Sequence, residues 1–160
     1  MSNHYHFVTR WRMEGEAAVV YDLLTDPLHY ERWWRGPMLK VQELKAPDER
    51  GLNQTVCFQM KGGRLPYSLK WESRCIELNK PYYFVSEVNG DFFGKGAWTF
   101  KQDGPWVDIT FDWDVRVQKP AIRYFSFLLR LFFVANHNWV MRTWQESLHR
   151  ELIKISRTGS

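Results

Sequence analysis

The segment from Val107 to Val117 constrains the fold of this chain more than any other stretch of its sequence. Apolar residues at every odd position alternate there without a break with polar residues at the even positions, among them Asp108, Asp112 and Asp114. A period of two is typical of a β-strand with one buried and one solvated face. Antiparallel sheets tolerate one wet face, so the pattern predicts such a sheet, with another element covering its apolar side.

Six further strands are predicted by the same alternation and by the turn signals between them. They are residues 5–13, 38–46, 54–61, 69–76, 82–89 and 94–101. Glycine, proline and asparagine separate the later strands, as at Gly62-Gly63 and Asn79-Lys80-Pro81, and such short turns suit antiparallel neighbours. Strand parity then places the following residues on the apolar face: Val56, Phe58, Met60, Leu69, Trp71, Trp98 and Phe100.

Helical patterns flank this run of strands. Two short helices are expected after the first strand, over residues 16–24 and 28–33, with Val19, Val20, Leu23 and Leu24 on the buried face of the first. A long C-terminal helix is expected from Pro120 to about Arg157. A straight helix of that length would span about 55 Å, so we expect a break or kink between about Leu131 and His137.

The aromatic content connects this fold to a function. Nine Trp, eleven Phe and seven Tyr make up 17% of the 160 residues. Large rings either fill a core or line a pocket. One helix is too thin to contact the whole apolar face of a sheet that curves around it. The sequence therefore predicts a cavity between the sheet and the helix.

Charge and cysteine content exclude other classes of protein. The net charge is +4, but Lys and Arg are scattered over many segments, which argues against nucleic-acid binding. There is no signal sequence and no apolar run long enough to span a membrane, so a cytoplasmic location is expected. Cys57 and Cys75 would fall out of register in a hairpin about Gly62-Gly63 and are interpreted as structural thiols.

In this order of elements the chain resembles the SRPBCC superfamily, which includes START domains, Bet v 1-type allergens and polyketide cyclase/dehydrase proteins. The resemblance covers about residues 5–155, and its marks are the segments 16–26 and 30–34 and a late apolar strand leading into a helix with Asn136, Leu148 and Leu152. It implies an α+β helix-grip fold, in which a curved seven-stranded antiparallel sheet surrounds the long helix. Residues 1–160 then form a single ligand-binding domain.

The predicted cavity supplies the candidate binding residues. The sheet should contribute Phe58, Trp71, Trp98, Phe111 and Trp113, the long helix Phe132 and Asn136, and the mouth should lie near Trp33 and Trp34. A buried Asn136 or His137 needs a hydrogen-bond partner, which a ligand oxygen or a helix break could provide. Ser73 and Ser86 share the inward parity, whereas Glu72, Asp108, Asp112 and Asp114 should form a solvated face.

No catalytic constellation, metal site or cofactor motif is identified. His4 and His6 are the only closely spaced histidines, and one such pair is weak evidence for a metal. Three functions therefore stay open. The first is a carrier or sensor of a hydrophobic small molecule, lipid-like or polycyclic aromatic; the second is a polyketide cyclase or dehydratase acting on a similar ligand.

The third function is an interaction module. Residues 122–134 are apolar almost all round, with Arg123 and Arg130 as the only charges, so this segment is either buried or contacts a protein or membrane surface. Thirteen residues are too few to span a bilayer. Whether the chain is a monomer or a homodimer is left open.

Overall fold

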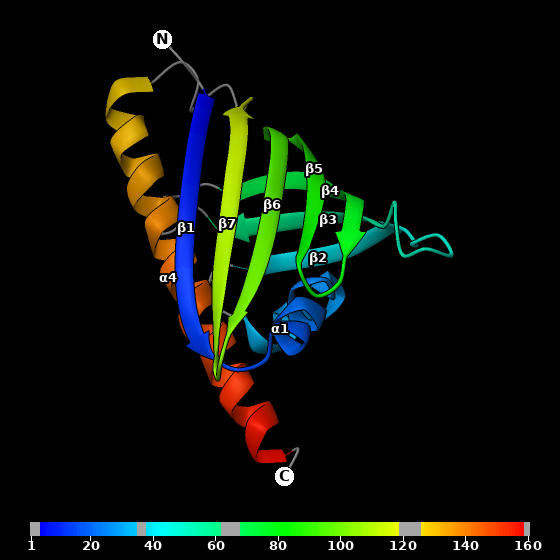
Figure 1. Ribbon diagram of the computed structural model, residues 1–160. Coiled ribbons are helices and arrows are strands. Elements are labelled where there is room, and N and C mark those ends of the chain that lie inside the picture. The colour runs from blue at the N-terminus through cyan, green and yellow to red at the C-terminus, as the bar shows by residue number, and fades with distance from the viewer. Residues whose placement is uncertain (1–3, 35–37, 62–67, 119–125, 159–160) are drawn as a thin grey trace.

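A seven-stranded antiparallel sheet forms the body of the computed structural model (Figure 1). The structure describes residues 4–34, 38–61, 68–118 and 126–158, without the side chains of residues 38, 39, 126–130, 132 and 133. The strands are β1 (His4–Glu14), β2 (Met38–Lys45), β3 (Thr55–Lys61), β4 (Ser68–Asn79), β5 (Tyr83–Gly90), β6 (Phe92–Asp103) and β7 (Trp106–Val117). Their order is β1-β7-β6-β5-β4-β3-β2, so the first strand closes the sheet beside the last.

The register of the sheet confirms the predicted faces. Val107, Ile109 and Phe111 are buried, while the side chain of Asp112 is 45% exposed. β1 continues the same two faces because Trp11 pairs with Ile109 and Arg12 with Asp108. A slip of one residue would exchange every buried and exposed side chain, so the hydrophobic pattern excludes such a slip.

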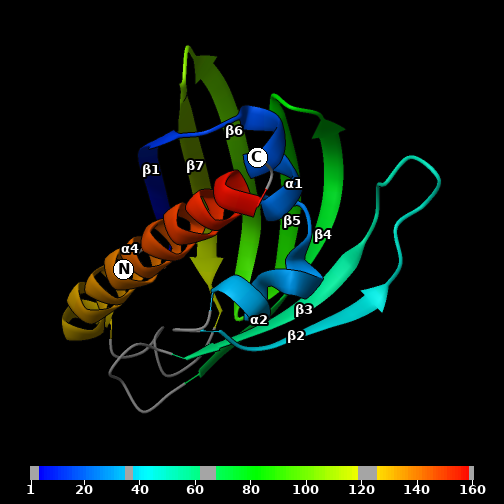
Figure 2. The same ribbon diagram turned by 90° about the horizontal axis from the view of Figure 1, so that it is seen from below.

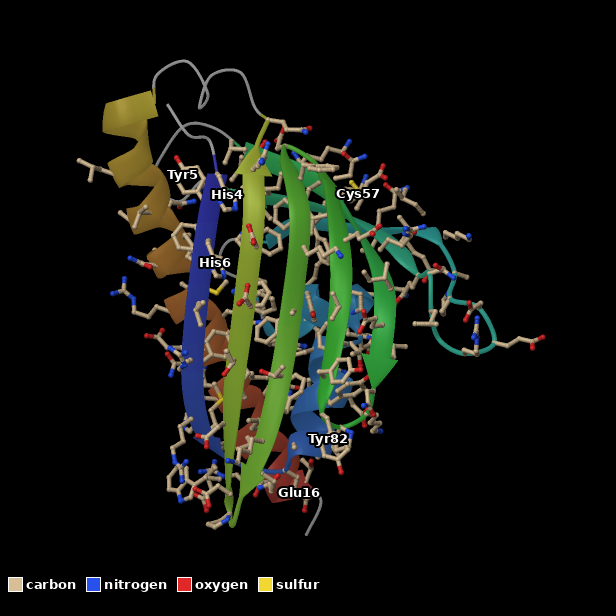
Figure 3. The ribbon with its side chains drawn as sticks, turned by 45° about the horizontal axis from the view of Figure 1, so that its top comes forward. His4, Tyr5, His6, Glu16, Cys57 and Tyr82 are labelled. Atoms are coloured by element: carbon tan, nitrogen blue, oxygen red, sulfur yellow. The ribbon has the colours of Figure 1, made fainter. Side chains whose placement is uncertain are left out.

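The outer face of the sheet is charged and paired across strands. His6 Nε2 lies 2.9 Å from Asp112 Oδ1, His4 contacts Asp114, and Arg12 contacts Asp108 at 2.8 Å. Figure 3 labels His4 and His6 on β1. These groups are about half exposed, as expected for a solvated face. The described residues contain no group of His, Cys, Asp and Glu that could hold a metal ion.

Two short helical segments follow β1. They are α1 (Ala17–Leu24) and the continuous pair η1 (Pro27–His29) and α2 (Tyr30–Trp33). On α1, Val20 and Leu24 are buried as predicted, but Val19 and Leu23 are only partly buried. The ring of Tyr21 is buried in their place, packed edge-on against Phe84 and Phe100.

The long helix α4 (Ser126–Thr158) crosses the concave side of the sheet (Figure 2). The predicted break between Leu131 and His137 is wrong, because helix is assigned without interruption through these residues. Residues 126–158 contain no proline or glycine to interrupt the hydrogen-bond ladder. The helix instead continues past the end of the β6–β7 hairpin, as Figure 1 shows.

Residues 122–125 of the apolar segment 122–134 lie outside the described residues, as do the side chains of the remainder except those of Leu131 and Val134. Of its side chains, that of Leu131 is 65% exposed and that of Val134 packs partly buried against the core. Among the described residues, no helix combines the length and the apolar character needed to cross a membrane.

Candidate ligand-binding cavity

A cavity of about 390 Å³ separates the concave face of the sheet from the helices. Its walls come from β3 to β7 on one side, α4 on the opposite side, and α1, η1 and α2 at one end (Figure 2). Pockets that hold drug-sized ligands occupy about 300–1,000 Å³, so this volume is sufficient for a small organic molecule.

The sheet side of the cavity is largely aromatic, since strand parity sends every second ring inward. The rings of Trp98 and Phe111 stack with centroids 4.2 Å apart, and Phe58 stacks on Trp71 at 5.6 Å. Gly96 has no side chain and so leaves room for the ring of Trp113, because a Cβ at position 96 would come within 3.0 Å of that ring. The result is an apolar wall of aromatic rings that stack on one another.

The α4 side of the cavity combines apolar and polar groups. Its lining residues are Asn136, His137, Val140, Met141 and Trp144, which recur at helical spacing along one face. Three polar atoms on this face are buried without a hydrogen-bond partner among the described residues: Asn136 Oδ1, His137 Nε2 and Trp144 Nε1. Buried polar atoms are nearly always paired, so three orphans on one wall are unusual.

Other polar groups near the cavity are already satisfied. The buried hydroxyl of Tyr30 donates to the carbonyl of Leu24, and burial raises the pKa of this phenol. Trp34 Nε1 donates to Thr143 Oγ1 at 3.2 Å. These two groups hold the walls in position, whereas the unpaired atoms on α4 and the hydroxyls of Ser73 and Ser86 can bond a ligand.

The electrostatic character of the cavity is close to neutral. Burial lowers the pKa of His137 to about 4, so the imidazole is uncharged near pH 7. Its ring stacks on Phe7 with centroids 3.9 Å apart. Among the described lining residues, only Lys61 carries a permanent charge, and it is exposed at the end of β3.

The structure brings together most of the residues proposed from the sequence. The following line the cavity: Trp34, Phe58, Trp71, Trp98, Phe111, Trp113 and Asn136, together with Ser73 and Ser86. The side chain of Phe132 lies outside the described residues. Whether the lining residues contact a ligand stays a prediction.

The positions of Trp33 and of the cavity mouth differ from those that the sequence predicted. Trp33 borders a second hollow between α2 and α4, whereas Trp34 is fully buried in the cavity wall. The exposed members of the lining set are Pro47 and Lys61. The mouth is therefore not beside the tryptophans, because α2 ends after Trp33 and turns Trp34 inward.

The sequence analysis left Trp144, Tyr30 and Tyr21 out of the candidate site. Trp144 follows Asn136 by eight residues on the predicted long helix. Two turns of helix return to nearly the same face, and this spacing was the available signal. Tyr30, beside Trp33 and Trp34, was a possible residue of the cavity mouth, but surface packing of the short helix was the preferred interpretation.

Comparison with known proteins gives structural matches alone. No protein-family model matches the chain, and no curated protein matches its sequence. Among solved structures, the Zhui aromatase/cyclase from Streptomyces sp. R1128 is similar with a TM-score of 0.78 and 15% identity over 98% of both chains. A START superfamily protein from Mycobacterium smegmatis gives 0.69 and 11%, over 94% of this chain and 98% of that one.

A plant protein shares the same architecture. The major latex-like protein 151 of Panax ginseng matches with a TM-score of 0.64 and 9% identity, over 89% of this chain and 96% of its own. Identities this low establish the fold alone. The chain has the SRPBCC, START-like helix-grip fold that its sequence resembled.

Proposed function

We propose that this protein binds a hydrophobic small molecule in the cavity between its sheet and α4. The observation that carries the proposal is a cavity of about 390 Å³ whose aromatic walls leave the space open. Nine tryptophans could have filled such a volume, and here Trp34, Trp71, Trp98, Trp113 and Trp144 border it. Burying apolar surface contributes roughly 25 cal/mol per Å², so a ligand in contact with these walls gains affinity.

The shape of the walls favours a flat ligand over a flexible chain. Trp98 and Phe111 lie within 17° of parallel, and Trp71 and Phe58 within 29°. Offset stacking of a ligand ring on such a surface adds about 0.5–1.5 kcal/mol beyond area burial. We therefore propose a fused aromatic ligand in preference to a lipid chain.

Tryptophan fluorescence during titration with apolar probes tests this proposal. We expect saturable quenching by polycyclic probes such as flavonoids and weaker effects of fatty acids. Trp98→Ala and Trp113→Ala should each change the quenching amplitude and the affinity. Trp106→Ala is the matched control, because Trp106 is 41% exposed on β7. If no probe produces a response, the ligand-binding proposal is wrong.

A second candidate, an aromatase or cyclase acting on a similar ligand, is favoured by His137. The Nε2 of this neutral imidazole is unpaired inside an apolar cavity, and in its Nε2–H tautomer it could hydrogen-bond and polarise a ligand carbonyl. The neighbouring amide of Asn136 could stabilise the developing enolate oxygen by hydrogen bonding. The fold likeness to an aromatase/cyclase supports the comparison.

Turnover of a poly-β-ketone substrate distinguishes the enzyme from the carrier. An enzyme would give a cyclised product faster than the spontaneous reaction, and His137→Leu would abolish the difference. His149→Leu is the control, because His149 is exposed on the same helix. Binding without any acceleration leaves the carrier as the function.

A further inference from the structure

We infer that the ligand of this cavity is an uncharged molecule bearing a hydroxyl group, which Asn136 and His137 hold against α4. The inference deepens the proposed ligand-binding function and rests on it. It follows from what the orphaned atoms on α4 can bond and from the charges that are present around them.

Asn136 and His137 together form one unpaired polar site. They are consecutive on α4, both line the cavity, and Asn136 Oδ1 and His137 Nε2 are buried without a partner among the described residues. An unpaired buried polar group destabilises the folded chain. Leucine at both positions would remove that destabilisation, so the two polar side chains are best explained by a partner that the ligand brings.

The hydrogen-bonding capacity of the two side chains selects a hydroxyl group. Asn136 Oδ1 can only accept, so the ligand must donate to it. Neutral His137 either donates or accepts at Nε2, depending on its tautomer. A hydroxyl group has one proton to donate and lone pairs to accept with, so it can donate to Asn136 Oδ1 and accept from the Nε2–H tautomer of His137 at the same time. A ketone oxygen cannot donate to Asn136.

The charges around the cavity exclude a ligand carboxylate next to Asn136 and His137. The imidazole of His137 is neutral, and Lys61, the charged residue of the described lining, lies exposed at the end of β3. An ionised group buried against neutral side chains loses its hydration without gaining a counter-charge. A fatty acid held at α4 would meet this penalty, whereas a phenol or alcohol would not.

Three probes on one ring system test the inference: naphthalene, 2-naphthol and 2-naphthoate. Isothermal titration calorimetry at pH 7 compares the same bicycle carrying hydrogen, a hydroxyl group or a carboxylate. We expect 2-naphthol to bind the wild-type protein about tenfold more tightly than naphthalene, which corresponds to one or two hydrogen bonds. We expect 2-naphthoate to bind more weakly than 2-naphthol.

Leucine variants test which side chains cause the preference for 2-naphthol over naphthalene. Asn136→Leu and His137→Leu should each reduce the ratio of 2-naphthol affinity to naphthalene affinity by about threefold or more. Asn138→Leu and His149→Leu are the matched controls, because both residues are exposed on α4. His137→Gln keeps a neutral polar group and should retain more of the preference than His137→Leu.

Each outcome separates this inference from the proposed function. Equal binding of naphthalene and 2-naphthol, tightest binding of 2-naphthoate, or a preference that survives in both leucine variants overturns the inference and leaves apolar ligand binding intact. Failure of all three probes to bind overturns both. The wild-type comparison needs no variant, so it decides the ligand class even if a leucine variant does not fold.

Discussion

The indole of Trp34 lies parallel to that of Trp144, with ring centroids 4.1 Å apart and an angle of 11° between the planes. This stack joins the end of α2 to the middle of α4, and the bond from Trp34 Nε1 to Thr143 Oγ1 reinforces it. The two rings also border the cavity. The contact therefore holds the helical end of the cavity in place.

Trp34→Ala should lower the free energy of unfolding by about 3–5 kcal/mol, because it deletes a fully buried aromatic ring and leaves a void. Urea denaturation measures the change. Trp106→Ala is the control and should cost under about 1.5 kcal/mol, since that ring is 41% exposed. Equal losses in the two variants would show that the stack does not hold α2 on α4.

Gly96→Ala should weaken ligand binding by about threefold or more without unfolding the protein. The added Cβ would lie 3.0–3.2 Å from atoms of Trp113 and Phe111, which must move to accommodate it. Calorimetric affinity for 2-naphthol and thermal unfolding measure the two effects. Ala97→Val, on the opposite face of β6, is the control; if it weakens binding equally, the shape of this wall does not limit the ligand.

Asn136→Leu should raise the free energy of unfolding by about 1 kcal/mol or more while it lowers the affinity for a hydroxylated ligand. The reason is that the variant removes a buried acceptor without a partner and adds apolar surface. Urea denaturation of the ligand-free protein measures the stability. A marked loss of stability would instead indicate that Asn136 has a structural partner.

His137 should make stability depend on pH. Its folded pKa of about 4 lies below the ordinary value of 6.5, so the unfolded chain binds the proton first as the pH falls. Stability attributable to this residue is complete above about pH 6.5 and declines to a lower plateau near pH 4, by up to about 3 kcal/mol. Unfolding of the wild type and His137→Leu at several pH values measures the difference.

The exposed histidines serve as the control for that experiment. His149→Leu should retain the wild-type pH dependence, because His149 is exposed. If His137→Leu and the wild type lose stability in parallel between pH 6.5 and pH 4, His137 is not buried in its neutral form.

Asp112→Asn should change the free energy of unfolding by less than about 1 kcal/mol and leave ligand affinity unchanged. Its pair with His6 is about half exposed on the outer face of the sheet, where solvent screens such contacts. Urea denaturation and calorimetry check the two parts. A loss of affinity would mean that the outer face communicates with the cavity.

The sequence alone determined the strands of the sheet, the face on which each of their side chains lies, and most of the cavity wall. The alternation from Val107 to Val117 assigns each side chain to a face by local geometry, because successive residues of a strand point to opposite sides. The same parity placed Phe58, Trp71, Trp98 and Phe111 on the cavity side without knowledge of their partners. Short turns between antiparallel strands then left little freedom in the order of the sheet.

The tertiary structure decided which helical residues face the cavity and which of them lack a partner. Trp33 and Trp34 are adjacent in a short helical segment, and only packing against Trp144 selects Trp34 for the wall. The continuity of α4 and the unpaired state of Asn136 and His137 likewise depend on groups distant in the sequence. Helical periodicity predicts an apolar face, but burial and pairing arise only when the helix docks on the sheet.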